Sequence, residues 1–158
     1  MSDVVILGAG SWGTAIAQLL ALNGHTVIMW DKFPEHLADI ERARENKKFL
    51  PGIKLPDSII FEKNLNIAVN ASKIIVFAIP TQFIRDILSF INAKILTTKT
   101  IINLAKGIET STLKRISEIF EEFVGNEVLN NFCVLIGFLH VEEVFRFNGQ
   151  SRIGTWSF

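Results

Sequence analysis

Residues 4–20 read VVILGAGSWGTAIAQLL, and this stretch decides the fold. Its short run of branched apolar residues is typical of a buried strand, and the apolar residues after the glycines recur at helical spacing. The pattern between them is G-x-G-x-x-G. Gly8 permits a tight turn, Gly10 lets the backbone approach a pyrophosphate, and Gly13 lets the helix pack closely on the strand. A strand, this turn and a helix in that order predict dinucleotide binding.

Two further features support a dinucleotide site. The helix that follows the glycines presents unpaired N–H groups and the positive end of its dipole to phosphates. Asp31 follows a second expected strand, twenty-one residues after Gly10, where an acid accepts hydrogen bonds from the adenosine ribose. The next residue is Lys32, and a cation there accommodates a 2′-phosphate instead. The pair leaves the choice between NAD and NADP open.

Charge and cysteine content exclude several classes of protein. Sixteen basic and sixteen acidic residues cancel, and the sequence pI is about 6.8, so no global charge attracts nucleic acid or an anionic membrane. No apolar run reaches the roughly 18 residues of a membrane span. A single cysteine and the lack of a basic and apolar leader before the first strand favour a cytoplasmic setting. We therefore expect neither a nucleic-acid nor a membrane partner.

The apolar content is unusually high. Hydrophobic residues make up 49% of the chain before its ten glycines are counted, and thirteen residues are Phe. Ordinary soluble domains reach roughly 45–50% with glycine included. We expect an uncovered apolar face that favours self-association or another partner.

Strand-like and helix-like segments alternate along the rest of the chain. At 158 residues the chain suits one domain of this kind. The expected strands are residues 26–30, 59–61, 73–78, 100–104 and 132–136, and the expected helices are 34–46, 65–70, 83–91 and a segment capped by Ser111 or Thr112 that ends at Gly125. Residues 47–56 are expected to form a loop, His36 to lie on a solvated surface, and Cys133 to be buried.

This alternation predicts an α/β fold with a Rossmann-like, doubly wound and mainly parallel sheet. In such a sheet the ligand lies beyond the carboxyl ends of the strands. Asp31, Pro80, Lys106 and Gly137 each follow an expected strand. We therefore expect these four residues to converge on one crevice. No metal site is predicted.

Several ordered motifs resemble the bacterial type of NAD(P)-dependent glycerol-3-phosphate dehydrogenase. The resemblance covers residues 3–144, and its blocks are GAGSWGT at residues 8–14, REN at 44–46, FLPGI at 49–53, LP at 55–56, AIP at 78–80, AKGIE at 105–109 and HVEEV at 140–144. The family implies hydride exchange between NAD(P)H and dihydroxyacetone phosphate or glycerol 3-phosphate, in the supply of phospholipid precursors. Other reductases with this fold, such as ketopantoate-type enzymes, fit the FLPGI and AKGIE blocks less well.

The resemblance also implies roles for single residues. Ser11 and Trp12 resemble cofactor contacts at the glycine turn, and Lys32 stands where the family commonly has a basic residue beside the adenosine. Lys106 is similar to the lysine that contacts both cofactor and substrate, and an ammonium can stabilise a phosphate or a polarised carbonyl oxygen. Gly137 matches the first residue of a substrate-binding turn.

The chain departs from the family pattern towards its end. Where the family reads G-P-S-H-A, residues 137–141 read GFLHV, so Leu139 replaces a serine that would contact substrate. Residues 145–158 match nothing in the family. The predicted division is therefore an NAD(P)-binding Rossmann domain at 1–144 and an unmatched tail at 145–158, with the family's second, helical domain missing.

The missing part carries the family's general acid and base lysine, so no catalytic residue is assigned in residues 1–158. Positioned acid catalysis is worth roughly 10²–10⁴-fold. The sequence thus predicts a truncated relative that binds NAD or NADP, has weak or lost affinity for the small phosphate substrate, and shows little activity alone. A non-catalytic NAD(P)-binding or interaction module and a decayed gene product are the alternatives.

Overall fold

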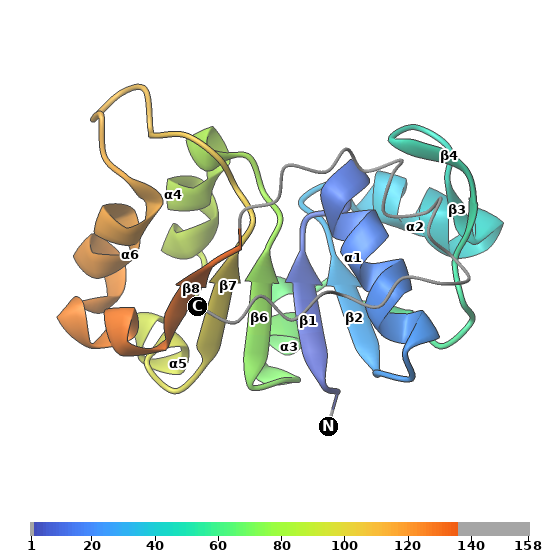
Figure 1. The fold of residues 1–158 in the computed structure, drawn as a ribbon, viewed down its shortest axis with the longest axis horizontal. Coiled ribbons are helices and arrows are strands. Elements are labelled where there is room, and N and C mark those ends of the chain that lie inside the picture. The colour runs from blue at the N-terminus through green and yellow to red at the C-terminus, as the bar shows by residue number, and fades with distance from the viewer. Residues whose placement is uncertain (1, 136–158) are drawn as a thin grey trace, which may run out of the picture.

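The computed structural model describes residues 2–135, and its centre is a six-stranded, all-parallel sheet with the order β5-β2-β1-β6-β7-β8. Figure 1 shows the strands side by side with helices covering the sheet. The strands are β1 (Val4–Leu7), β2 (Val27–Trp30), β5 (Ile60–Phe61), β6 (Ile74–Phe77), β7 (Thr100–Asn103) and β8 (Phe132–Val134). The predicted Rossmann-like class is confirmed.

Alternate residues of the buried strands serve two separate cores, because successive side chains of a strand point to opposite faces. Val4 and Ile6 of β1 face a core shared with α1 (Ser11–Leu22) and α2 (Pro34–Ala43). Val5 and Leu7 face the other core, which is covered by α3 (Leu65–Asn70), α4 (Thr81–Ser89), α5 (Ala93–Leu96) and α6 (Ile116–Val124). The described chain therefore forms three layers, with helices on both faces of the sheet.

The segment after α2 differs from the prediction. The helix ends at Ala43 rather than at residue 46, because Arg44 adopts a left-handed conformation with φ of 48°. Instead of a helix end and a loop, two short strands follow, β3 (Glu45–Asn46) and β4 (Leu50–Lys54), which pair in an antiparallel hairpin. Asn46 and Leu50 are buried, so the hairpin packs against the body of the domain.

Two expectations near the end of the described chain are also wrong. Neither Ser111 nor Thr112 caps the last long helix, since α6 begins at Ile116 and the preceding Leu113 has φ of 59° and is 73% exposed. Cys133 is exposed rather than buried. Its strand, β8, lies at the end of the strand order and pairs only with β7 among the described strands. A short 3-10 helix (Asn126–Asn131) connects α6 to this strand.

Candidate functional site

The three glycines of the turn after β1 occupy different surroundings. Gly8 has φ of 108°, and a Cβ atom there would lie 2.6 Å from the Ala78 carbonyl oxygen. A Cβ atom on Gly13 would lie 1.9 Å from the Gly8 carbonyl oxygen, so α1 packs directly on the end of β1. Gly10 has no neighbouring atom within 4 Å of its Cβ position. The turn is thus tightly packed at Gly8 and Gly13 and open at Gly10.

The open side of the turn faces a cavity of about 730 Å³, here named the glycine-turn pocket. This size lies within the range of small-molecule and cofactor sites. The predicted residues that line it are Gly8, Gly10, Ser11, Trp12, Asp31, Lys32, Pro80 and Lys106. Gly13 lies beneath the pocket in the helix–strand contact, and Gly137 lies outside the described residues. Residues from the ends of β1, β2, β6 and β7 therefore meet at one place.

The first turn of α1 forms the floor of the pocket. Gly10 is the N-cap of the helix, and neither a side-chain cap nor an acidic residue is present in the first turn. The Thr14 hydroxyl donates to the Gly10 carbonyl oxygen over 2.7 Å, which fixes the turn from the helix side. N–H groups at such an end attract anions because they have no partner within the helix.

Asp31 is held at the end of β2 by two backbone hydrogen bonds. Its Oδ2 accepts from the Ala9 N–H over 2.6 Å, and its Oδ1 accepts from the Phe33 N–H over 2.9 Å. These bonds tie the carboxylate to the glycine turn. Each carboxylate oxygen keeps a further lone pair, so Asp31 can still accept hydrogen bonds from a ligand in the pocket.

Lys32 lies on the rim beside α4. Its Nζ is 3.9 Å from Asp86 Oδ2 and 5.8 Å from the centroid of the Phe83 ring. Both charged side chains are about half exposed, with 47% and 63% exposure, and exposed pairs of this kind contribute little stability. The ammonium can therefore turn towards an anion in the pocket at small cost.

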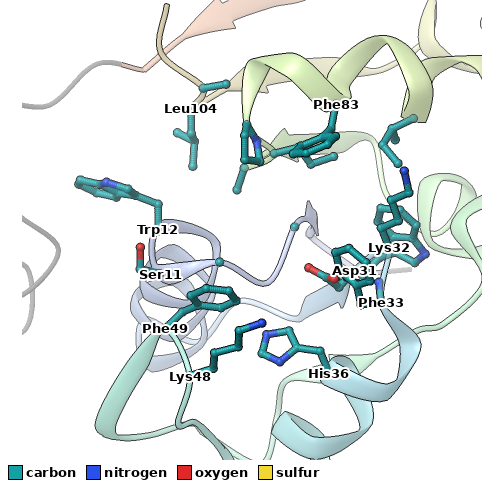
Figure 2. Close-up of a pocket in the computed structure, with 18 of the residues that line it drawn as sticks. Ser11, Trp12, Asp31, Lys32, Phe33, His36, Lys48, Phe49, Phe83 and Leu104 are labelled. Atoms are coloured by element: carbon teal, nitrogen blue, oxygen red, sulfur yellow. Dashed lines mark hydrogen bonds between the residues drawn. The ribbon is translucent and has the colours of Figure 1, made fainter.

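The wall opposite Lys32 is formed by residues that sequence reasoning missed. His36 of α2 and Lys48 and Phe49 of the hairpin line the pocket, and Figure 2 shows the three side chains grouped below Asp31. His36, expected on a solvated surface, has its Nε2 3.3 Å from the Ala9 carbonyl oxygen. Sequence analysis did not identify these pocket residues, because it predicted a helix through residue 46 and a loop after it. The structure has the β3–β4 hairpin there instead.

Asn46 joins the hairpin to the glycine turn. Its buried Nδ2 donates to the Ala9 carbonyl oxygen and to the Thr14 hydroxyl, each over 2.8 Å. Its Oδ1 accepts from the Phe49 N–H over 3.2 Å. One side chain thus fixes the turn, the helix start and the hairpin relative to one another. The sequence signal for it is an asparagine within the REN block, which by itself suggests only a helix end.

Lys106 enters the pocket from the loop between β7 and α6. The Thr81 hydroxyl, at the start of α4, donates to the Lys106 carbonyl oxygen over 2.7 Å. The next turn of this loop is held by Gln82, whose Nε2 donates to the Ile108 carbonyl oxygen over 2.9 Å and whose Oε1 accepts from the Thr110 N–H over 2.9 Å. The start of α4 therefore sets the position of the Lys106 backbone.

A partly buried ion pair holds the same loop from further along α4. Glu109 is 3% exposed and accepts two hydrogen bonds from Arg85, with Nε–Oε1 and Nη2–Oε2 distances of 2.8 and 2.9 Å. The Thr112 hydroxyl donates to the same carboxylate. The Arg85 guanidinium and then the Thr112 hydroxyl lower the pKa of Glu109 to about 2. Arg85 also pairs with Glu122 of α6 over 2.8 Å, which links the loop to two helices.

Neither a metal site nor a membrane-spanning helix was found in the described part of the chain. Residues 2–135 contain no cluster of three or more histidine, cysteine or carboxylate side chains placed to bind a metal ion. None of their helices has the length and apolar character needed to cross a bilayer.

Comparison with known proteins matches this chain to a dehydrogenase family. The family described as NAD-dependent glycerol-3-phosphate dehydrogenase N-terminus matches residues 3–149. Glycerol-3-phosphate dehydrogenase (NAD(P)+) of Geobacillus kaustophilus is 44% identical over 144 residues, which are 91% of this chain and 42% of that protein. The chain therefore spans less than half the length of this curated relative.

Solved structures agree with this match. The glycerol-3-phosphate dehydrogenase of Saccharomyces cerevisiae is 27% identical with a TM-score of 0.71, over 92% of this chain and 44% of that one. The Plasmodium falciparum enzyme is 26% identical with a TM-score of 0.72, over 90% of this chain and 42% of that one. Both similarities cover most of the described fold.

Proposed function

The chain belongs to the N-terminal, NAD-binding domain family of glycerol-3-phosphate dehydrogenases, and from this we propose that the glycine-turn pocket binds NAD(H) or NADP(H). One observation carries the proposal: the open space above Gly10 lies at the uncapped start of α1. A diphosphate there meets N–H donors and the positive end of the helix dipole without a side chain in between.

The arrangement of the pocket gives the cofactor a direction. Asp31 lies at the β2 end and Lys106 at the β7 end, with the glycine turn between them. We propose that Asp31 binds the adenosine ribose, that the turn binds the pyrophosphate, and that the nicotinamide points towards Lys106. This direction agrees with the way ligands cross the carboxyl ends of strands in doubly wound sheets.

The substrate proposal rests on the family. We propose that the reaction served by this domain reduces dihydroxyacetone phosphate to glycerol 3-phosphate, a phospholipid precursor, or runs in reverse. The cofactor supplies or accepts the hydride. The Lys106 ammonium would stabilise the substrate phosphate or its carbonyl oxygen. Gly137, proposed as a substrate contact, lies outside the described residues.

Cofactor binding can be tested directly by tryptophan fluorescence. Trp12 and Trp30 both line the pocket, so we expect NADH to quench the emission of the 158-residue chain in a saturable manner. ADP-ribose should compete, because it carries the adenosine and pyrophosphate that the proposal places at Asp31 and Gly10. An emission spectrum that NADH and NADPH leave unchanged, together with no heat of binding in calorimetry, would contradict the proposal.

Activity is a separate test. Carbonyl reduction needs a positioned proton donor besides the hydride, and such a donor is worth roughly 10²–10⁴-fold. Since no residue of this chain is assigned that role, we expect the 158-residue chain alone to consume NADH slowly with dihydroxyacetone phosphate. A parallel assay with a full-length relative gives the reference rate. Equal rates for the two proteins would show that the assignment of roles is wrong.

Exposed apolar side chains support a second candidate function, as an interaction module. Phe33, Phe49 and Phe83 on the pocket walls are 44–65% exposed, and Val134 and Leu135 at the end of β8 are 53% and 55% exposed. Patches of this kind favour association. Light scattering at increasing protein concentration tests it: growth of the mass supports self-association, and a constant monomer mass contradicts it.

A further inference from the structure

Lys48 lies in the turn of the β3–β4 hairpin, and this hairpin has a fixed position. The buried Asn46 at its start donates to the Ala9 carbonyl oxygen and the Thr14 hydroxyl, each over 2.8 Å, and accepts from the Phe49 N–H. Lys48 stands between these two anchored residues. Its backbone is therefore held against the glycine turn, although its side chain is exposed.

A chain of contacts places the Lys48 side chain at the Asp31 end of the pocket. The Lys48 Nζ lies 4.8 Å from the centroid of the Phe49 ring, and this ring meets His36 edge to face at 5.3 Å. His36 Nε2 is 3.3 Å from the Ala9 carbonyl oxygen, and the N–H of the same residue binds Asp31. Figure 2 shows the Lys48 amine pointing into the pocket, towards the side on which Asp31 lies.

Two lysines lie near Asp31 at this end of the pocket, and a site that binds only NAD does not need this positive charge. Asp31 is the acid expected to bind the ribose hydroxyls, and an acid there repels a 2′-phosphate. Here the two carboxylate oxygens already accept backbone N–H groups, and lysines flank the acid from two walls. Lys32 lies on the α4 side and Lys48 on the hairpin side. Two cations can balance the acid and a phosphate together.

We propose that Lys48 determines cofactor specificity by contacting the 2′-phosphate of NADP(H), opposite Lys32. This inference rests on the proposed function, because it requires the adenosine end of the cofactor to lie at Asp31. A charge-assisted contact between an ammonium and a phosphate is among the stronger hydrogen bonds in proteins. It exists only for the phosphorylated cofactor, so it discriminates NADPH from NADH.

The hairpin provides a matched control. Lys47 is the neighbouring residue, has the same charge and is exposed, but it does not line the pocket. The experiment compares the Kd values of NADPH and NADH for the unchanged chain, Lys48→Met and Lys47→Met by tryptophan fluorescence. We expect Lys48→Met to weaken NADPH about tenfold and NADH less than about twofold. Lys47→Met should leave both within about twofold, and Lys48→Arg should retain NADPH binding.

Other outcomes separate the possible failures. Equal weakening of both cofactors by Lys48→Met would mean that the lysine meets the pyrophosphate, and no weakening would mean that it meets no phosphate; either result overturns the inference. An unchanged chain that binds NADH but not NADPH keeps the proposed function and overturns the role of Lys48. A chain that binds neither cofactor overturns both proposals.

Discussion

Gly10 and Gly13 belong to one motif, but the space around their Cβ positions differs. A Cβ atom on Gly13 would overlap the Gly8 carbonyl oxygen at 1.9 Å, whereas one on Gly10 meets no protein atom within 4 Å. Backbone atoms on both sides cannot move apart without separating α1 from β1. Close packing of the fold therefore requires glycine at position 13, whereas the role of Gly10 follows from the proposed pyrophosphate site.

Alanine substitutions separate these two roles. We expect Gly13→Ala to lower the free energy of unfolding by about 3 kcal/mol or more, because the clash is with backbone. Gly10→Ala should change it by no more than about 1 kcal/mol, yet weaken NADH roughly tenfold, since the methyl group enters the pyrophosphate space. Urea denaturation and NADH titration measure the two effects. If Gly10→Ala binds NADH as the unchanged chain does, the pyrophosphate lies elsewhere.

Asn46 is a residue whose importance only its partners reveal. We expect Asn46→Ala to lower the free energy of unfolding by about 2 kcal/mol, because the buried acceptors on Ala9 and Thr14 lose their donor. NADH affinity should fall too, since the glycine turn loses its link to the hairpin. Asn66→Ala, on the exposed surface of α3, is the control for urea denaturation and titration. Unchanged stability in Asn46→Ala would show that the side chain is not an anchor.

An ion pair on α4 helps to position the connection between β7 and α6. Glu109, with its pKa lowered to about 2 by Arg85 and then Thr112, holds the loop that carries Lys106. Because the folded-state pKa lies below the ordinary value of 4.5, the folded state binds fewer protons than the unfolded state at acidic pH. The contribution of the pair to stability is therefore present above about pH 4.5 and is lost as pH falls towards 2.

This linkage gives a pH-dependent prediction for Glu109→Gln. The variant should be less stable than the unchanged chain at neutral pH, and the difference should shrink steadily as pH falls from 4.5 towards 2. Urea denaturation at a series of pH values measures the difference. Glu127→Gln, at an exposed position after α6, should show a much smaller difference. A gap for Glu109→Gln that stays constant across this range would contradict the ion-pair account.

Strand β8 shows how an element's environment can differ from its sequence pattern. Residues 132–136 look like a buried strand, but among the described strands β8 has one neighbour, and Cys133 is exposed. We expect a water-soluble thiol reagent to modify Cys133 in the native chain within about tenfold of its rate in the urea-unfolded chain, because an exposed thiol is accessible in both states. A thiol that reacts only after unfolding would show that this position is covered.

At the scale of the whole molecule, parallel pairing brings distant residues to one edge. Asp31, Pro80 and Lys106 follow β2, β6 and β7, and all three line the pocket together with the glycine turn. A parallel sheet places the carboxyl ends of its strands on the same side. For this reason the convergence of these residues could be predicted before any contact was known.

The sequence by itself determined a Rossmann-like, mainly parallel α/β architecture, the glycine turn and the residues that follow the strand ends. Apolar residues repeat every two residues in a half-buried strand and about every 3.6 residues in an amphipathic helix. This spacing therefore predicts which strands and helices form and in what order. Only the tertiary structure decided the wall formed by His36, Lys48 and Phe49. The hairpin that carries Lys48 and Phe49 is attached by contacts between residues far apart in the sequence. Asn46 and Ala9, for example, are 37 positions apart. These contacts depend on a hairpin held by one buried amide, and no local pattern of apolar residues encodes such a contact.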